Sequence, residues 1–378
     1  MKKLLCWILC FCVFAGAMGV SHAAAAFSDP RVDMNATRSR ADINVRDPFI
    51  LVYEDTYFMY ATGCAPPGYG CYVSTDLENW AGPVRVWSPP AGSDANGNYW
   101  APECHYYNGY FYIFATYIRR SVGLSTCTIL RGDNPLGPFT EITPDGMAPA
   151  DTPWIDSSFY VDREGQPWMV YCEEVVVWSQ IESIKAVKLL PDLTGYAGEP
   201  VKLLGNEDLY RGIPHISEGP FLYRSETGEL LMLWSGYTNN GYVVAQSRSA
   251  SGDILGPWVH KNWHLYERSY QIEEDAGHGM LFTGTDGQLY LSVHYPNNWG
   301  DFGKERAVFV PVRDYGNAVA VIADTEPGNF GAFIKDPGVA DFLDSIIRSD
   351  FFLFRWLGEL IYWNVSEFVA WYESIFRT

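Results

Sequence analysis

Four acidic residues and one histidine stand at similar places in successive segments of the chain. They recur about every 57 residues, and each precedes an aromatic and aliphatic run that a turn interrupts. The five positions are Asp47, Glu103, Asp156, Glu218 and His278, the last within Gly-His-Gly. If the fold brings them together, they offer what acid–base chemistry requires, namely one protonated carboxyl and one ionised carboxylate.

The segments between these positions have the pattern of short strands. Apolar side chains alternate over 57–60 and 110–114, and turn pairs such as Asn108 and Gly109 mark the middle of each repeat. A repeat of this length built from strands predicts an all-β fold, a five-bladed β-propeller with about four strands in each blade. Closure of the ring would bring all five positions to one axis.

Carboxylates gathered at an axis repel one another and lose hydration, so their grouping costs stability unless it serves a purpose. Each acid taken alone could simply cap a strand or a turn. As a set, in a chain with 16% aromatic residues that can stack on sugar rings, they favour hydrolysis of glycosidic bonds.

The chain divides into four regions. Residues 1–26 read as a signal peptide, with two lysines, an apolar core and a small-residue cleavage site, which predicts a secreted or periplasmic protein. Residues 27–43 form a connector that could supply a closing strand, and 44–330 form the catalytic propeller. Residues 339–378 have apolar positions at helical spacing and predict a helical extension.

The helical extension has two interpretations. It could dock on the propeller or on another subunit, or it could lie on a membrane, which its excess of acidic residues disfavours. Beyond the signal segment no apolar run is long enough to span a membrane. The net charge of −19 disfavours nucleic acid as a partner, because nucleic acid is itself negative.

Eight cysteines are present, and three of them belong to the signal segment. The odd number that remains argues against a disulfide-dependent scaffold. Cys64 and Cys71 flank a turn-rich segment between two strand patterns, so they could either form one bridge or stay as thiols.

Five motifs taken in order resemble glycoside hydrolase family 43, five-bladed propeller enzymes that act on arabinans and xylans. The motifs are Arg46–Phe49 (RDPF), Trp100–Glu103 (WAPE), Trp154–Asp156 (WID), Ser217–Phe221 (SEGPF) and Gly277–Gly279 (GHG). The resemblance extends over about residues 44 to 325. It implies an inverting glycosidase of arabinofuranosidase, xylosidase or arabinanase type acting on a poly- or oligosaccharide.

The resemblance also assigns roles to three acids. Asp47 matches the general base that activates water, and Glu218 matches the general acid that protonates the departing oxygen. Asp156 matches the third carboxylate, the pKa modulator that orients the acid. An inverting pair is expected to stand about 6.5 to 9.5 Å apart, which leaves room for the attacking water.

The remaining site residues are predicted to bind substrate or an ion. Trp100 and Trp154 are candidate platforms for a sugar ring, although either could instead pack between blades. Glu103 would position the site, and Arg306 resembles a late family arginine that could bind sugar hydroxyls or a catalytic acid. His294 is a weaker candidate.

No cofactor is required by this chemistry. His278 resembles the family's axial histidine, which in a number of members helps to hold calcium through water. Two interpretations follow: His278 helps to hold a structural calcium ion, or it is hydrogen-bonded in the channel without a metal.

Two other functions fit part of the pattern. Fructan-cleaving propellers would begin with a Trp-Met-Asn-Asp-Pro type of motif, whereas this chain has Val45-Arg46-Asp47-Pro48. A non-catalytic carbohydrate-binding propeller would keep stacking aromatics without needing three acids in phase.

Overall fold

The structure is a computed structural model. It describes residues 27–322 except 176–179, 207–215, 240, 262, 269–273 and 298–302. The predicted signal peptide (1–26) and the predicted helical extension (339–378) lie outside the described residues.

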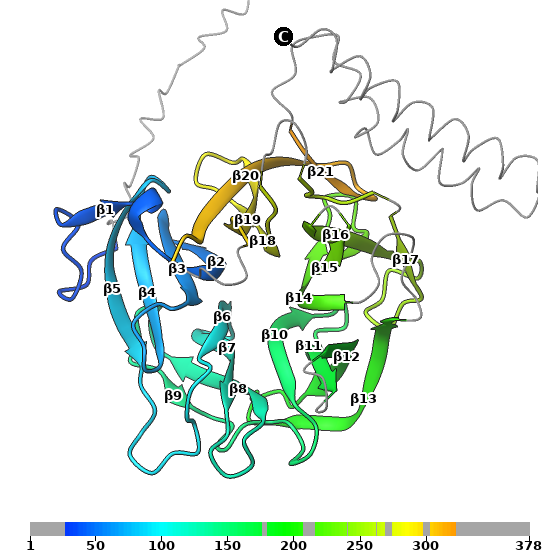
Figure 1. Cartoon of the computed structure of the whole chain (residues 1–378), viewed down its shortest axis with the longest axis horizontal. Helices are drawn as coiled ribbons and strands as arrows, with labels where there is room; N and C mark the ends of the chain where they lie inside the picture. Colours follow the sequence, from blue (N-terminus) through cyan, green and yellow to red (C-terminus); the bar gives the residue numbers. More distant parts are fainter. Residues whose placement is uncertain are drawn as a thin grey trace, which may run out of the picture.

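Five antiparallel sheets stand around a common axis, which confirms the predicted five-bladed β-propeller (Figure 1). In every blade the strands follow one another in chain order from the axis outward, except that β1 pairs as an extra strand at the outer edge of the first blade. The first strands of the five blades, β2, β6, β10, β14 and β18, lie nearest the axis.

The strands of each blade have the following bounds. Blade 1 contains β2 (Arg46–Tyr53), β3 (Thr56–Thr62), β4 (Tyr69–Ser74), β5 (Asn79–Trp87) and, outermost, β1 (Thr37–Ser39). Blade 2 contains β6 (Trp100–Tyr107), β7 (Tyr110–Ile118), β8 (Ser125–Gly132) and β9 (Thr140–Glu141). Blade 3 contains β10 (Trp154–Val161), β11 (Pro167–Val175), β12 (Gln180–Leu189) and β13 (Tyr196–Gly205). Blade 4 contains β14 (Ile216–Arg224), β15 (Leu230–Thr238), β16 (Gly241–Ser249) and β17 (Trp258–His260). Blade 5 contains β18 (Gly277–Thr283), β19 (Leu289–Tyr295), β20 (Arg306–Asp314) and β21 (Val319–Val321).

Each innermost strand carries an irregularity near its beginning. The pairing with the second strand shifts there, and one residue takes a left-handed backbone conformation, with φ between 41° and 67°. The five equivalent residues are Asp47, Ala101, Asp156, Gly219 and His278. Such a conformation is unfavourable for residues other than glycine, and irregularities of this kind re-aim side chains next to active sites.

This alignment shows that the five positions marked in the sequence are not equivalent. Asp47, Asp156 and His278 occupy the left-handed position itself, whereas Glu218 lies one residue before it and Glu103 two residues after it. The carboxylates therefore leave the backbone at different heights along the axis.

Side chains at the ends of the second strands join neighbouring blades. In four of the five junctions such a side chain accepts a hydrogen bond from the backbone N–H of the next blade's left-handed residue. The pairs are Thr62 with Ala101 (2.8 Å), Thr116 with Asp156 (3.0 Å), Ser235 with His278 (2.8 Å) and His294 with Asp47 (3.4 Å). The last pair joins blade 5 to blade 1 and so closes the ring.

The N-terminal connector supplies a strand, but not in the last blade. β1 pairs with β5 at the outer edge of blade 1. The 3₁₀ helix that follows, η1 (Arg40–Asp42), contacts blade 5 through Arg40 Nη1 on the carbonyl of Ala307 at 2.8 Å. The connector thus covers one blade edge and reaches the neighbouring blade across the closure.

All five cysteines of the described residues are free and buried. The bridge considered between Cys64 and Cys71 is therefore not formed. Cys71 lies inside β4 and Cys64 follows β3, so both act as small apolar residues of the blade 1 core. Burial raises the pKa of both thiols, which keeps them protonated.

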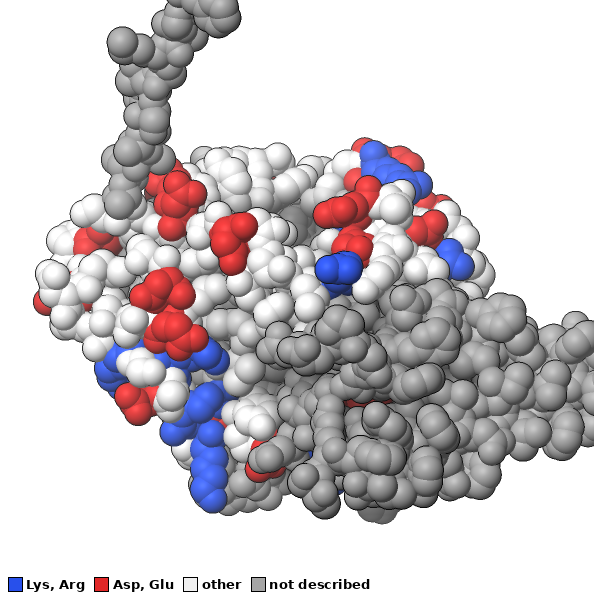
Figure 2. All heavy atoms as spheres, turned by 90° about the horizontal axis from the view of Figure 1, so that it is seen from above, with Lys and Arg blue, Asp and Glu red and all other residues white. Residues whose placement is uncertain are grey.

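Acidic side chains are spread over the face shown in Figure 2, in keeping with the net charge of −19. Among the described residues no helix is long and apolar enough to cross a membrane.

Candidate active site

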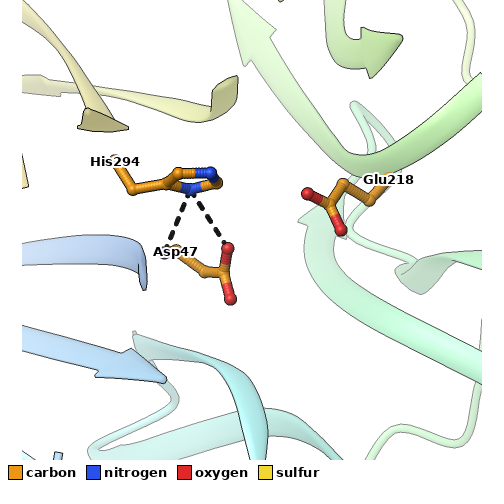
Figure 3. A group of neighbouring side chains, drawn as sticks. All are labelled: Asp47, Glu218 and His294. Carbon is orange, nitrogen blue, oxygen red and sulfur yellow. Dashed lines mark hydrogen bonds and ion pairs between the residues drawn. The ribbon is translucent and has the colours of Figure 1, made fainter. Parts of the chain in front are cut away.

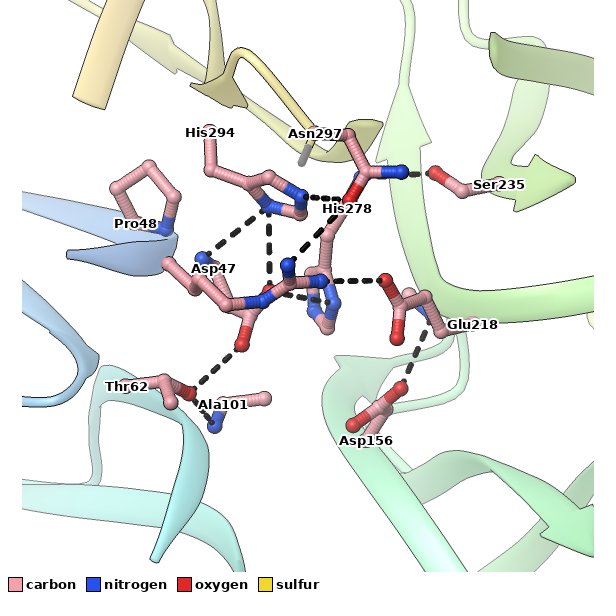
Figure 4. A network of polar contacts seen from close by, with 12 residues as sticks. Asp47, Pro48, Thr62, Ala101, Asp156, Glu218, Ser235, His278, His294 and Asn297 are labelled. Atoms are coloured by element: carbon pink, nitrogen blue, oxygen red, sulfur yellow. Dashed lines mark hydrogen bonds and ion pairs between the residues drawn. The ribbon is translucent and has the colours of Figure 1, made fainter. Parts of the chain in front are cut away.

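Asp47 lies at the axis beside the imidazole rings of His294 (Figure 3) and His278 (Figure 4). Its Oδ1 is 3.3 Å from Nδ1 of His278 and 3.3 Å from Nδ1 of His294, and Thr62 donates a hydrogen bond of 2.7 Å to Oδ2. Burial alone would raise the pKa of Asp47, but the charges of His278 and Arg46, together with the neighbouring His294, hold it well below its usual range. Asp47 is therefore an ionised carboxylate, as a proton acceptor must be.

Glu218 faces Asp47 from blade 4, and its side chain keeps 24% of its surface exposed. Its Oε1 accepts a hydrogen bond from the hydroxyl of Tyr242 and lies 3.5 Å from Nη2 of Arg46. One carboxylate oxygen of Glu218 and one of Asp47 lie within 4.8 Å of each other.

The separation of about 6.5 to 9.5 Å expected for an inverting pair refers to the two carboxyl groups as wholes, so it stays a prediction beside this contact between single oxygens. Arg46 contacts both carboxylates, with Nε 4.0 Å from Asp47 Oδ1 and Nη2 3.5 Å from Glu218 Oε1. A cation between two carboxylates draws them toward itself.

Arg46 is itself held by blade 5. Its Nη1 bonds Oε1 of Glu305, which is fully buried, and lies 3.3 Å from Oδ1 of Asn297. Arg306, the arginine predicted for this site, contacts none of the described acids, and binding of sugar hydroxyls by Arg306 stays a prediction. The Arg306 guanidinium donates to the backbone carbonyls of Ala41, Gly303 and Glu305. The side chain of the preceding residue, Glu305, points the other way and reaches Arg46, because neighbouring residues of an extended chain point in opposite directions.

Asp156 is the third carboxylate, and it is buried beside Glu218 (Figure 4). Its Oδ2 accepts a hydrogen bond of 3.4 Å from the backbone N–H of Gly219. Burial raises the pKa of Asp156 to about 8; the charges of Glu218 and Asp47 act in the same direction, and His278 opposes them. Asp156 thus holds a proton more tightly than an ordinary aspartate does, directly beside Glu218.

His278 stands among these acids and balances their charge. Burial would lower its pKa, but the charges of Asp47, Asp156 and Glu218, with a smaller effect of Glu103, outweigh burial and raise it. An imidazolium at this point offsets part of the repulsion between the carboxylates.

The residues around His278 do not fit a directly bound calcium ion. Calcium takes about six to eight oxygen ligands, whereas each group of converging donors in the described residues has two carboxylate oxygens and one imidazole nitrogen. The small cavity lined by Asp47, Glu103 and His278 has room for about one water molecule. An ion held through water stays a prediction, and no chemistry below depends on it.

The predicted aromatic platforms have different outcomes. Trp154 is 1% exposed and stacks on Tyr171 with ring centroids 4.1 Å apart, so it packs inside a blade and cannot stack on a sugar. Trp100 is half-buried and lies directly before the left-handed residue Ala101. Glu218 has the equivalent position in blade 4, directly before Gly219. It stays a candidate platform.

Glu103 lies deeper along the axis. It is 8% exposed, its Oε2 is 3.0 Å from Nε2 of His105, and it lines the small cavity with His278. This location fits the predicted positioning role better than contact with a sugar.

Three contributors were not predicted as site residues from the sequence: Tyr242, Asn297 and Glu305. Arg46 entered only as part of a motif. His294 had a usable signal, since it occupies in β19 the place that Thr62, Thr116 and Ser235 take in their own second strands.

Comparison with known proteins identifies a family. The model of glycosyl hydrolases family 43 matches residues 42–312. The extracellular exo-α-(1→5)-L-arabinofuranosidase ArbA of Cellvibrio japonicus (strain Ueda107) is 28% identical over 291 residues, which cover 67% of this chain and 79% of the relative. A putative β-xylosidase of Escherichia coli (strain K12) is 26% identical over 268 residues, 63% of this chain and 45% of that protein.

A solved structure agrees with this assignment. The endo-arabinase from Bacteroides thetaiotaomicron VPI-5482 superposes with a TM-score of 0.64 at 30% identity, covering 77% of this chain and 99% of that one. The family model spans well over half of the sequence, including every blade and all three acids. The chain is a glycoside hydrolase and belongs to glycosyl hydrolase family 43.

Proposed function

We propose that this protein is an exported glycosidase that hydrolyses α-L-arabinofuranosyl bonds of plant arabinan with inversion at the anomeric carbon. One observation carries the catalytic part. Asp47 is held ionised on one side of the axis, while the facing Glu218 stands beside Asp156, a carboxyl whose pKa is raised to about 8. One side of the site can therefore accept a proton while the other can donate one.

The roles follow from this difference. Glu218 gives its proton to the glycosidic oxygen as the bond to the anomeric carbon breaks. Asp47 takes a proton from the water that attacks the same carbon from the opposite face. The cycle leaves Glu218 ionised and Asp47 protonated, and exchange with solvent restores both.

Inversion requires room for the sugar and the attacking water between Asp47 and Glu218. Arg46 Nη2 is 3.5 Å from Glu218 Oε1, and we expect this contact to lengthen when substrate binds. The exposed fraction of the Glu218 side chain, 24%, leaves it free to turn toward the substrate.

The choice of substrate rests on the relatives. ArbA is named an arabinofuranosidase and the B. thetaiotaomicron structure an endo-arabinase, and these two share 28% and 30% identity with this chain. A β-xylosyl substrate is the second candidate, supported by the putative β-xylosidase of E. coli at 26%.

Export is supported by two features of different kinds. Residues 1–26 have the composition of a signal peptide, and the relative ArbA is described as extracellular. Substrate polysaccharide of plant origin lies outside the cell, which agrees with this location.

The direct test is turnover by purified protein on aryl α-L-arabinofuranoside, aryl β-D-xyloside and debranched arabinan. We expect release from the arabinofuranoside and from arabinan. Xyloside turnover alone would replace the substrate and keep the reaction. No turnover on any glycan, in protein shown to be folded, would contradict the enzymatic role.

The variant Glu218→Gln separates catalysis from binding. We expect it to retain arabino-oligosaccharide binding and to lose about 10²- to 10⁴-fold in kcat on arabinan, the range of general acid catalysis. Unchanged turnover in this variant would exclude Glu218 as the acid.

A further inference from the structure

Tyr242 is a buried residue whose hydroxyl touches Glu218. It belongs to β16, the third strand of blade 4, and its side chain is fully buried. The hydroxyl donates a hydrogen bond to Glu218 Oε1. No motif of the sequence marks this tyrosine.

The ring of Tyr242 is fixed from both sides. It stacks on His294 with centroids 5.8 Å apart and an interplanar angle of 26°, and it lies against Tyr237 with centroids 4.7 Å apart. The backbone N–H of Tyr242 donates to Asp275 Oδ2 at 2.9 Å. The hydroxyl therefore has a defined position rather than a range of positions.

Gly277 leaves the space that this ring occupies. A Cβ atom at position 277 would lie 1.9 Å from Cε1 of Tyr242, closer than any real contact. The first glycine of the Gly-His-Gly motif is thus required by the aromatic ring beside the acid, while His278 serves the axis.

The donors on Glu218 are not shared equally between its two oxygens. Oε1 receives the Tyr242 hydroxyl and faces the Arg46 guanidinium, and both groups require an acceptor. A proton on Oε1 would meet these two donors, so the catalytic proton is placed on Oε2. Burial and the charge of Glu218 hold the pKa of Tyr242 well above its usual range, which keeps this hydroxyl a donor at working pH.

We propose that Tyr242 is a positioning residue that confines the catalytic proton of Glu218 to Oε2 and so aims it at the leaving oxygen. This inference rests on the proposed function in one respect, that Glu218 is the general acid. It predicts a specific defect without Tyr242. The carboxyl would remain, but its proton would be shared between two oxygens, of which only one faces the substrate.

The test compares leaving groups in Tyr242→Phe. The arabinose that departs from arabinobiose is a poor leaving group and needs the proton on its oxygen, whereas 2,4-dinitrophenolate leaves without help. We expect kcat on α-1,5-arabinobiose to fall about 10- to 100-fold, kcat on 2,4-dinitrophenyl α-L-arabinofuranoside to fall less than about threefold, and KM to change little. Equal loss on both substrates, or no loss on either, would overturn the proposal.

A matched control has the same substitution elsewhere. Tyr117 is also fully buried and donates to a carboxylate, Glu141 Oε1, at 2.8 Å, but in blade 2 away from the acids. Tyr117→Phe is expected to leave the ratio between the two substrates unchanged. A changed ratio in Tyr117→Phe would show that the signature is not specific to the acid.

Two further variants keep the proposal testable. In a Glu218→Gln background, adding Tyr242→Phe should cost no further activity on arabinobiose, because the acid is already absent. If Tyr242→Phe does not fold, Gly277→Ala should give the same leaving-group signature by displacing the ring. If the losses of kcat in Glu218→Gln and Tyr242→Phe multiply in the double variant, Tyr242 does not act through Glu218. If the wild-type protein turns over no substrate, the proposed function itself is contradicted.

Discussion

Asp47 and Asp156 occupy the same position in blades 1 and 3, yet their neighbours give them opposite proton affinities. Two histidines and an arginine surround Asp47, whereas Asp156 is buried beside Glu218 with little to compensate its charge. The same blade position thus yields one carboxylate that stays ionised and one carboxyl that holds its proton tightly. The difference arises from what adjacent blades contribute and not from the strand that carries each residue.

The raised pKa of Asp156 predicts a dependence of stability on pH. With a folded pKa of about 8 and an ordinary value of 3.8, the folded protein holds a proton here that the unfolded chain releases between about pH 4 and 8. Stability from this group therefore falls as the pH rises through that window. Each tenfold difference in proton affinity is ~1.4 kcal/mol, or about 2 to 4 °C in Tm for a domain of this size.

Asp156→Asn cannot ionise, so its Tm relative to wild type should rise by at least about 3 °C between pH 5 and pH 8. Thermal melts at both pH values measure this. Asp133→Asn, at an exposed turn, is the control and should show no such change. A difference that is constant with pH, or that falls, would show that Asp156 is ionised throughout.

The sequence predicts the axial residues better than their partners. The three acids and His278 could be named because the repeat marks their positions. Glu305 and Tyr242 could not, since Glu305 contacts Arg46 and Tyr242 contacts Glu218 from segments with no repeated signature, and only the closed ring brings them near. Nor could the sequence show that Trp154 packs inside its blade, because a one-residue step along a strand reverses the direction of a side chain.

At the level of elements, the second strands hold the blades in register through short polar links. Thr62, at the end of β3, accepts from the N–H of Ala101 in blade 2 and donates to Oδ2 of Asp47 in its own blade. The Thr62 hydroxyl therefore links the junction between blades 1 and 2 to the orientation of Asp47. Alternation and turn signals predicted the strands themselves, but not the irregularity that offsets Glu218 by one residue.

Thr62→Val keeps the shape of this side chain and removes both hydrogen bonds. We expect it to lower the free energy of unfolding by about 2 kcal/mol, because a buried N–H loses its acceptor, and to lower kcat several-fold because Asp47 loses a donor. Chemical denaturation and steady-state kinetics measure the two effects. Thr62→Ser retains the hydroxyl and should retain most of the stability and of kcat. Wild-type stability and kcat in Thr62→Val would show that these two hydrogen bonds do not orient Asp47.

At the scale of the whole molecule, no strand among the described residues is exchanged between the first and last blades. Side chains join these two blades, through His294 with Asp47 and through Arg46 with Glu305. The contacts that complete the ring therefore involve the residues that keep Asp47 ionised. The repeat could predict five blades and a common axis, but it could not predict that the connector would pair with β5.

The role proposed for Asp47 is that of a base toward water, without attack on the sugar itself. The stereochemical course of hydrolysis decides between these two roles. Proton NMR of the first sugar released from an aryl α-L-arabinofuranoside, recorded before mutarotation, measures it directly. We expect β-L-arabinofuranose to appear first. Initial release of the α anomer would mean that Asp47 forms a covalent glycosyl intermediate, and it would contradict the assigned role.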